Sequence, residues 1–456
     1  MKKHISLIVI VLMLMTMGYA SFAFGAVGAE EASKLGGPVL TPMGAERAGN
    51  KDGTIPVWTG VPIPIPMGFK PDSGVYVDPF ADEKPLFSIN AKNMNQYTDK
   101  LAEGVKALMK KYPDYRIDVY KTYRTLVFPP YVNDSTKKNA TVCQATKGGE
   151  AVTGKGCHGG IPFPLTKSGI EAMWNVQLAF QAPETYTSDL EAYNISSTGK
   201  VSLSVSTLLT VYQPWQDPNK EDDWRYMNML SRYSGPPRRN GEIIMSFQPL
   251  DYFDKGSVIW QYLPGQRRVR LAPDLCCDTP NPATAGASVF DDIYIFNGRM
   301  DRYNWKLIGK KELYIPYNAY RFAYYRGDVN KALLARYVNP DLVRWELHRV
   351  WVVEGTLKPG KRHIYQKRVI YLDEDSWSAV ISENYDRLGS FYRMAVQYPT
   401  YSYDVQAEYD KTISFYDLIA NQYAISQWPR LGGIKYMKNL PERFWSPDSM
   451  AASGLR

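Results

Sequence analysis

The strongest constraint on the fold is a run of four strand-like segments joined by short polar links. The segments span 342–355, 363–373, 376–385 and 389–398. The links between them are Lys358-Pro-Gly-Lys361, Asp373-Glu-Asp375 and Asp386-Arg-Leu-Gly389. A parallel crossover needs about a dozen residues or more, so links this short join antiparallel neighbours. The second half of the chain is therefore predicted to form an antiparallel meander.

Aromatic residues extend the same prediction to the rest of the chain. Tyr, Phe and Trp account for 13% of the 456 residues, and aromatic and β-branched side chains favour strands. Further strand-like segments, separated by Gly, Pro, Asn and Asp, are 201–212, 242–249, 257–262, 267–271, 289–296 and 305–315, with a last strand or short helix near 411–420. The chain is predicted to be mainly β, with some helix.

Two amphipathic helices are expected to cover the sheet. Apolar residues recur at spacings of three and four over 94–112. A second helix begins at Ser168, whose hydroxyl forms a capping box with Glu171. Shorter helices are expected at about 219–232 and 328–338. Because a sheet that is apolar on one face must bury that face, the two amphipathic helices are its natural covers.

Residues 1–26 are typical of a secretory signal peptide. Lys2 and Lys3 precede an apolar stretch from Ile5 to Met17, and small residues follow it as cleavage points. The apolar stretch is short for a membrane span and has no basic stop-transfer patch after it. We therefore expect cleavage and export to the periplasm.

The mature chain divides into three parts. Prolines recur through 27–90, and each removes an amide donor and disfavours helix in the residue before it. This part is expected to be a proline-rich extended arm, with Val61-Pro-Ile-Pro-Ile-Pro-Met67 laid over a surface. Residues 91–440 are expected to form a single sheet domain with helices, and 441–456 an irregular tail.

The four cysteines suggest disulfide chemistry, as expected for an exported chain. Cys143 and Cys157 flank a loop rich in Gly, Lys and Thr, and we expect a disulfide between them, although four cysteines permit three pairings. The adjacent Cys276 and Cys277 are consistent with a vicinal bridge, a soft-metal site or a reduced pair. No His or third Cys lies nearby to complete a zinc set, so no metal is expected.

The sequence segments that resemble catalytic or cofactor motifs lack the structural context that those motifs require. The glycine-rich run Gly149–Gly159 resembles phosphate-binding loops, but it lies inside the expected disulfide loop and neither follows a strand nor opens a helix. His348 and His363 are expected to be structural, and the pairs Asp291-Asp292 and Asp373/Asp375 to be solvated turns. We therefore expect no enzyme activity and no cofactor.

The charge pattern argues against nucleic-acid binding. The formal net charge is +8, but basic doublets such as Arg238-Arg239 and Lys367-Arg368 are interspersed with acidic residues in an exported chain. A peripheral contact with anionic lipid headgroups remains compatible with this pattern.

The segment Leu40-Thr-Pro-Met-Gly-Ala-Glu-Arg-Ala-Gly-Asn-Lys-Asp-Gly-Thr-Ile-Pro-Val-Trp-Thr-Gly60 resembles a family signature. The family is the exported bacterial domain of unknown function thirteen-twenty-nine, often labelled outer-membrane lipoprotein-sorting-like. Further matching segments are Asp278–Gly286, Asn297–Lys306, Lys310–Tyr317 and Tyr371–Trp377. Together they cover nearly all of the mature chain. The pair Cys276–Cys277 departs from the pattern expected just before Asp278.

The resemblance implies a fold similar to the periplasmic carriers of the Lol system. In that fold a large curled antiparallel sheet forms an unclosed barrel, helices plug its mouth, and an apolar hollow holds acyl chains. Family members are thought to act with outer-membrane proteins and resistance-nodulation-division exporters. The resemblance thus implies a partner of that kind and an association with the outer membrane.

Apolar residues on the strands are the candidate lining of such a hollow. Alternation groups them by strand, and core packing against the helices is the commoner role for any single one of them, since most inward apolar side chains simply fill space. The candidates are Trp345, Leu347, Trp351, Trp377, Ile381, Tyr385, Met394 and Val396.

The predicted function is that of a periplasmic carrier or binding protein for a lipid, a lipoprotein acyl chain or another hydrophobic compound. Three other functions stay open. They are a structural subunit of an envelope complex, an exported enzyme acting on glycans, and an outer-membrane barrel, which the proline-rich arm and the amphipathic helices disfavour.

Overall fold

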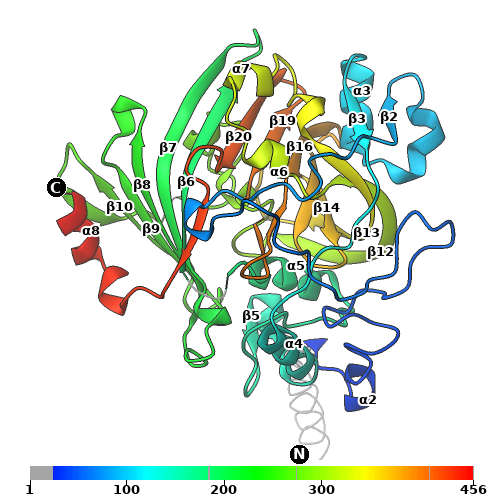
Figure 1. Ribbon diagram of the computed structural model, residues 1–456. Helices are drawn as coiled ribbons and strands as arrows, with labels where there is room; N and C mark the ends of the chain where they lie inside the picture. The colour runs from blue at the N-terminus through cyan, green and yellow to red at the C-terminus, as the bar shows by residue number, and fades with distance from the viewer. Residues whose placement is uncertain (1–23, 183–184, 274, 410, 455–456) are drawn as a thin grey trace, which may run out of the picture.

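One sheet of 16 strands is the scaffold of the protein. The computed structural model describes residues 24–182, 185–273, 275–409 and 411–454. Figure 1 shows that the sheet is strongly curved and open. Its strand order runs from β11 at one edge to β2 at the other, and among the described residues no ladder joins these two edges. The predicted large, curled, unclosed and mainly antiparallel sheet is confirmed.

The strands pair in an order that mixes both halves of the chain. In that order they are β11 (Arg268–Leu271), β10 (Val258–Leu263), β9 (Ile243–Pro249), β8 (Arg225–Gly235), β7 (Val201–Tyr212), β6 (Thr185–Ile195), β20 (Gln422–Trp428), β19 (Ile413–Asp417), β16 (Phe391–Gln397), β15 (Ala379–Tyr385), β14 (Lys367–Asp373), β13 (Arg344–Leu357), β3 (Arg116–Val119) and β2 (Phe87–Asn90). Two more strands pair beside this path, β12 (Tyr303–Pro316) on β13 and β21 (Ile434–Met437) on β6. The pair β13–β3 is parallel, and the other described pairs are antiparallel.

Two small sheets lie outside this scaffold. One consists of β1 (Phe24–Gly25), β4 (Gln144–Thr146) and β5 (Ala151–Thr153). The other is the hairpin of β17 (Thr400–Ser402) and β18 (Ala407–Tyr409).

The meander expected from the short links is confirmed. Strands β13, β14, β15 and β16 follow one another in the chain and pair antiparallel in that order. Strand β7 begins and ends at the predicted residues 201 and 212. The short links therefore determined this part of the topology, as the geometry of antiparallel neighbours requires.

Helices are short and lie around the sheet. The α-helices are α2 (Ala29–Ala32), α3 (Glu103–Lys111), α4 (Pro130–Val142), α5 (Gly169–Leu178), α6 (Tyr320–Ala323), α7 (Val329–Ala332) and α8 (Pro447–Gly454). The 3-10 helices are η1 (Pro71–Ser73), η2 (Met94–Lys100), η3 (Lys147–Gly149), η4 (Pro214–Gln216), η5 (Pro237–Arg239), η6 (Pro282–Thr284), η7 (Phe290–Asp292), η8 (Pro340–Leu342) and η9 (Glu442–Phe444). The predicted cap of α5 is confirmed, because the Ser168 hydroxyl accepts the amide of Glu171 at 3.2 Å.

Three predicted helices differ from the structure. The helix expected at about 328–338 is limited to α7, and Leu333 then pairs with Val338 in an isolated β-bridge. The stripe over 94–112 is divided into η2 and α3, because Leu101 between them is extended and buried in the core. The helix expected at 219–232 is wrong, since most of that segment belongs to β8. Strands β7 and β9 flank β8 and satisfy its backbone hydrogen bonds on both sides, which outweighs local helix propensity.

The strand expected at 289–296 is also wrong. This segment forms η7, and Tyr294 and Ile295 then adopt left-handed backbone conformations with φ of 58° and 68°. Side-chain anchors, described below, fix it on the sheet in place of a strand ladder.

The arm and the tail make defined contacts. The arm over 27–90 begins with α2 and ends in β2, and hydrogen bonds tie its irregular part to the body, such as that from Trp58 Nε1 to the carbonyl of Leu126 at 3.0 Å. The tail, expected to be irregular, forms η9 and α8, because Trp445 and Met450 are buried against β8, β9 and β10.

The predicted signal peptide lies almost entirely outside the described residues, which begin at residue 24. In the part of the chain that is described, no helix has both the length and the apolar character needed to cross a bilayer.

Candidate functional site

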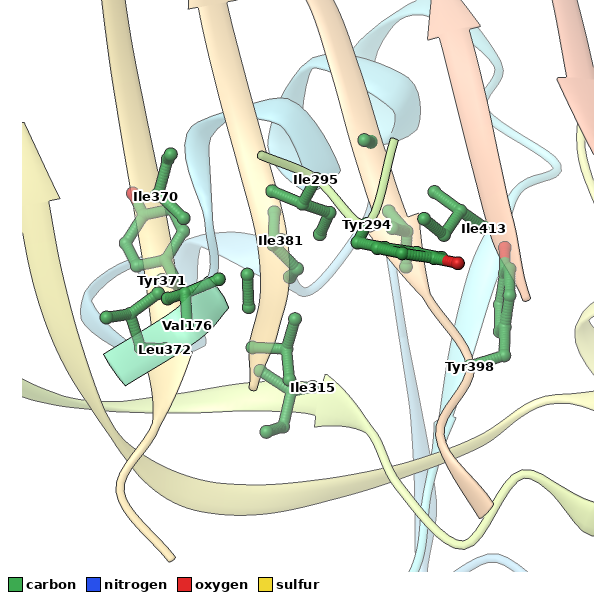
Figure 2. Close-up of a cluster of buried hydrophobic side chains, with 14 of the residues drawn as sticks. Val176, Tyr294, Ile295, Ile315, Ile370, Tyr371, Leu372, Ile381, Tyr398 and Ile413 are labelled. Carbon is green, nitrogen blue, oxygen red and sulfur yellow. The ribbon is translucent and has the colours of Figure 1, made fainter. Parts of the chain in front are cut away.

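The two ends of the sheet are filled differently. On the C-terminal half, side chains of the protein itself pack the interior, and Figure 2 shows part of this cluster of buried hydrophobic side chains, including Ile370 and Leu372 of β14, Val176 of α5 and Ile295. On the half built from β7 to β10, residue 273 and residues 275–302, together called segment 273–302, cover the inner face and leave open space. This half carries the candidate site.

Alternation along β8 and β9 explains why this half has two apolar faces. Leu230 and Met245 point outward and are buried beneath α8, which lies on the outer flank of β10 in Figure 1. Met229 and Ile244 point to the opposite, inner face. Successive strand residues point to opposite faces of the sheet, so both faces of β8 and β9 are apolar. The tail helix α8 covers the outer face, and segment 273–302 covers the inner face.

Two neighbouring cavities occupy the inner face, with volumes of about 280 and 110 Å³. Met229, Ile244, Phe290 and Ile293 line both. The larger cavity also touches Ser246, Gln248, Ile259, Pro273, Leu275, Cys276, Cys277, Asn297, Arg299 and Arg302. The smaller one also touches Leu190, Ala192, Val205, Thr207, Leu209, Ser231, Tyr233, Arg239 and Pro282. The lining is mainly apolar, which is typical of small-molecule sites.

Two arginines stand at one end of the larger cavity. Arg299 pairs with Glu150 at 2.6 Å, and Arg302 approaches Asp278 at 3.4 Å. Both side chains are partly exposed. The larger cavity therefore joins an apolar lining to partly exposed ion pairs of Arg299 and Arg302.

A buried ionic cluster fixes the segment that forms the cavity wall. Arg368 of β14 is fully buried and contacts Asp291 at 3.0 Å and Asp292 at 2.6 Å. His363 Nε2 lies 3.1 Å from Asp291, and the Tyr365 hydroxyl donates to Asp292 at 2.8 Å. The prediction that Asp291 and Asp292 form a solvated turn is wrong. Ion pairs and hydrogen bonds with the residues just named hold both carboxylates in the core.

The electrostatics of the two aspartates differ although they are adjacent. Burial alone would raise the pKa of Asp291, but Arg368 and His363 hold it below its ordinary value. Burial raises the pKa of Asp292, and the charge of Asp291 adds to that effect. The cluster thus keeps Phe290 and Ile293 in place through charged contacts in a dry environment.

The eight residues predicted to line a hollow do not form one wall. Six of them are buried in the core, while Trp351 and Tyr385 are partly buried, and none belongs to either cavity described above. Trp345, Leu347 and Trp351 share one face of β13. Pairing of Val352 with Tyr371, and of Tyr371 with Ile381, shows that β15 carries Ile381 on the other face.

Packing confirms this division. Trp377 leaves the strand pattern with φ of 67° and stacks on Trp351 at 5.8 Å. On the other face Met394 lies so close to Gly104 that α3 has no room for a side chain there. Tyr385 and Val396 share that face with Ile381. A role for these eight residues in ligand binding stays a prediction.

A second buried polar cluster lies at the end of β14. His348, Asp373 and Asp375 each place one donor atom within 4.8 Å of the others, and all three are buried. Burial, together with the charge of Asp375, raises the pKa of Asp373 to about 8. The expectation that Asp373 and Asp375 are solvated is therefore wrong, whereas His348 and His363 both have the polar partners expected of structural histidines.

The cysteines divide as the sequence suggested. Cys143 and Cys157 form a disulfide, which confirms that pairing. Cys276 and Cys277 are free thiols with their Sγ atoms 2.7 Å apart, beside Arg302 at the larger cavity.

The cavity residues on β7 to β10 were missed by sequence reasoning. The strands β7, β9 and β10 were predicted, but β8, which lies between two of them, was assigned to helix. The alternation Met229, Ser231, Tyr233 with Leu230 and Arg232 between them is the signal that would have identified both the strand and its inner face.

The fold and the cavity together define a class: an open, curled, mainly antiparallel sheet that encloses an apolar cavity on its inner face. Residues 88–451 match the family described as "Protein of unknown function (DUF1329)". The chain belongs to this family, as the sequence resemblance predicted.

Similar proteins have been found both by sequence and by structure. An uncharacterized protein of Pseudomonas aeruginosa is 38% identical over 408 residues, covering 89% of this chain and 88% of that protein. A crystal structure of a DUF1329 family protein from Desulfovibrio piger has a TM-score of 0.41 at 14% identity, over 62% of this chain and 95% of that one. A LolA superfamily protein from Nitrosomonas europaea has a TM-score of 0.37 at 11% identity, over 62% and 100% of the two chains.

Proposed function

We propose that this protein is a periplasmic carrier or binding protein that buries the apolar part of a lipid, a lipoprotein or another hydrophobic compound in the cavity beneath segment 273–302. The observation that carries the proposal is the mainly apolar lining shared by the two cavities. Together the cavities reach the lower part of the range of about 300–1,000 Å³ that is common for small-molecule sites. The proposal assigns no catalytic step to the chain.

The driving force is removal of hydrocarbon from water. Burial is worth about 0.8 kcal/mol per methylene, so a chain of roughly fourteen methylenes supplies about 11 kcal/mol if it is fully buried, before ordering costs. Transfer driven by the free energy of hydrocarbon burial needs no ATP, so an exported protein can carry it out. Release to an acceptor requires only that the acceptor hold the hydrocarbon more favourably.

The two arginines that line the larger cavity give the ligand an orientation. Arg299 and Arg302 lie where an apolar chain inside the cavity would end at solvent. An amphipathic ligand with a polar or anionic head therefore fits better than a pure hydrocarbon. Its head would share these arginines with Glu150 and Asp278.

Under the same proposal the protein acts in the periplasm. Export through a cleaved signal peptide would bring it to the periplasm, and the resemblance implies an outer-membrane protein or a resistance-nodulation-division exporter as partner. Such a partner would supply or receive the hydrophobic ligand.

Native mass spectrometry of protein taken gently from periplasm tests the proposal. We expect adducts that organic extraction removes. Ile244 lines both cavities, so Ile244→Phe should reduce the adducts severalfold. The same change at Ile308, which is 48% exposed on β12, should leave them unchanged. A clean apo mass for the unaltered protein would refute the carrier.

A structural subunit of an envelope complex is the second candidate. The large cluster of buried hydrophobic side chains in the C-terminal half, part of which Figure 2 shows, favours it, because side chains of the protein itself occupy that region. The apo mass just described, with co-purification of a stable envelope partner, is the result this candidate predicts.

A further inference from the structure

A buried histidine and two aspartates meet far from the cavity. His348 lies on β13, Asp373 ends β14, and Asp375 lies in the turn before β15. One ring nitrogen and one oxygen from each carboxylate lie within 4.8 Å of one another. The side chains are 5% exposed or less, so the arrangement is not a solvated acidic patch.

The charges around this cluster leave one carboxylate without a cation. Asp375 receives two hydrogen bonds from Arg124, at 2.8 and 2.5 Å. The adjacent Glu374 pairs with Arg349 at 2.8 Å, and Glu346 pairs with Arg344 at 2.5 Å.

Asp373 is the exception. Its Oδ2 accepts from the hydroxyls of Ser376 at 2.9 Å and Tyr317 at 3.4 Å. Its Oδ1 is buried without a hydrogen-bond partner, and no lysine or arginine in the described residues forms an ion pair with it. This oxygen is therefore a buried polar atom without a partner, and a cation bound at this point would supply one.

Outer contacts fix the donors in the manner of a metal centre. The Nε2 atom of His348 lies 3.3 Å from a carboxylate oxygen of Glu346, and the ring of Tyr317 stacks on the imidazole at 3.8 Å. Arg124 orients Asp375. Protein metal ligands are commonly held this way, with the histidine bonded to a carboxylate and the ligating carboxylates bonded in turn.

We propose that His348, Asp373 and Asp375 bind one divalent first-row transition-metal ion, of the kind represented by Mn²⁺ and Zn²⁺. Such ions accept imidazole nitrogen and carboxylate oxygen together, at about 2.0–2.2 Å, so small side-chain rotations bring the three donors onto one ion. This departs from the expectation of no metal.

The ion has a structural role that is separate from the cavity. It joins β13 to the turn after β14, and that turn also holds the N-terminal arm, since Trp377 donates to the carbonyl of Met43 at 2.9 Å. Arg124, which binds Asp375, also donates to the carbonyl of Arg47 at 3.1 Å. Metal binding would therefore secure the arm on the sheet.

The test measures metal content of the full chain exported from cells grown with added Mn²⁺ and Zn²⁺, after gel filtration. We expect about one ion per chain in the unaltered protein. The variants Asp373→Asn and His348→Gln should retain less than about a tenth of that amount. The control His363→Gln removes another buried histidine that contacts an aspartate, at 3.1 Å, and should retain the ion.

A second set of measurements excludes the thiols, and its spectroscopic part uses the unaltered protein. The double variant Cys276→Ser/Cys277→Ser should keep the ion. Protein loaded with Co²⁺ should show d–d absorption without a thiolate charge-transfer band. The proposal is overturned if the unaltered protein holds less than about a tenth of an ion, if Asp373→Asn keeps the ion, or if the cysteine variant loses it.

Discussion

Glu383 shows what one buried carboxylate does to stability. It lies on β15, is 1% exposed, and accepts hydrogen bonds from the amide of Gly104 at 2.8 Å and the hydroxyl of Tyr371 at 3.1 Å. Burial raises its pKa above the ordinary value of 4.5. Because the folded state holds the proton more tightly, this residue's contribution is fully present below about pH 4.5 and is lost as the pH rises through the folded pKa.

Glu383→Gln should remove that pH dependence, because an amide stays neutral and keeps an acceptor for Gly104. We expect the stability of the unaltered protein relative to this variant to fall between pH 4.5 and pH 7.5, measured by urea unfolding at both pH values. An equal difference at the two pH values would contradict the assignment.

The vicinal cysteines offer a second test on single residues. The Cys277 thiol donates to Cys276 and lowers the pKa of Cys276 to about 7, while the pKa of Cys277 is raised. Since the thiolate is the reactive form, iodoacetamide should label Cys276 first, with a half-maximal rate near pH 7. Peptide mass spectrometry across pH 6–9 measures both sites.

Cys277→Ala removes the donor. The half-maximal rate at Cys276 should then move toward pH 9, the ordinary value for this thiol. An unchanged profile would show that the hydrogen bond does not set this reactivity.

The sequence does not show which of its charged residues are buried. Asp292 and its partner Arg368 are 76 positions apart, and Asp375 and Arg124 are 251 apart. Short acidic runs between strands are typical of solvated turns, and only a distant cation makes them core residues. For this reason the sequence alone predicts a surface position for both aspartate pairs.

At the scale of elements, strand existence was easier to predict than strand face. Alternation predicted the apolar side of β13 and of β16 separately. The relative faces depend on irregularities between strands, such as the register shift at Tyr371/Leu372. One extra residue reverses every side chain that follows, so the predicted lining was divided between the two faces.

The tail helix α8 is stabilised by its packing on the sheet and not by its own sequence. Its sequence has little helical signal, but Met450 is fully buried against the outer face of β8 to β10. Met450→Ala should therefore destabilise the protein by about 2–5 kcal/mol, the usual cost of removing a buried methionine side chain. Urea unfolding followed by far-ultraviolet circular dichroism measures the change.

Met67 provides the matched control, because it is 98% exposed in the arm. Met67→Ala should change stability by no more than about 0.5 kcal/mol. If Met450→Ala were equally neutral, α8 would not be docked on the sheet in solution.

At the scale of the whole molecule, the open curled sheet and the family were both accessible from sequence. Short links determine antiparallel neighbours, and long signature segments identify relatives. The cavity was not accessible, because it depends on how segment 273–302 lies over β7 to β10. That placement follows from Asp291 and Asp292 binding Arg368 on a strand from the other half of the sheet.

A ligand that binds only the folded protein must raise its stability, and the rise depends on ligand concentration. At a hundredfold excess over its Kd, such a ligand adds about 2.7 kcal/mol. Palmitate, with roughly fourteen methylenes, should therefore raise the Tm of delipidated protein in a dose-dependent way. Calorimetry of the unaltered protein, Ile244→Phe and Ile308→Phe measures the shift, each against its own ligand-free Tm.

Filling the cavity at Ile244 should greatly reduce the shift, because this side chain belongs to the wall shared by both cavities. The exposed site at Ile308 should leave the shift intact. Equal shifts in all three proteins would place palmitate elsewhere on the surface, because only occupancy of the inner face is sensitive to the volume at Ile244. Ligand binding in the proposed cavity therefore requires that Ile244→Phe lose the shift and that Ile308→Phe keep it.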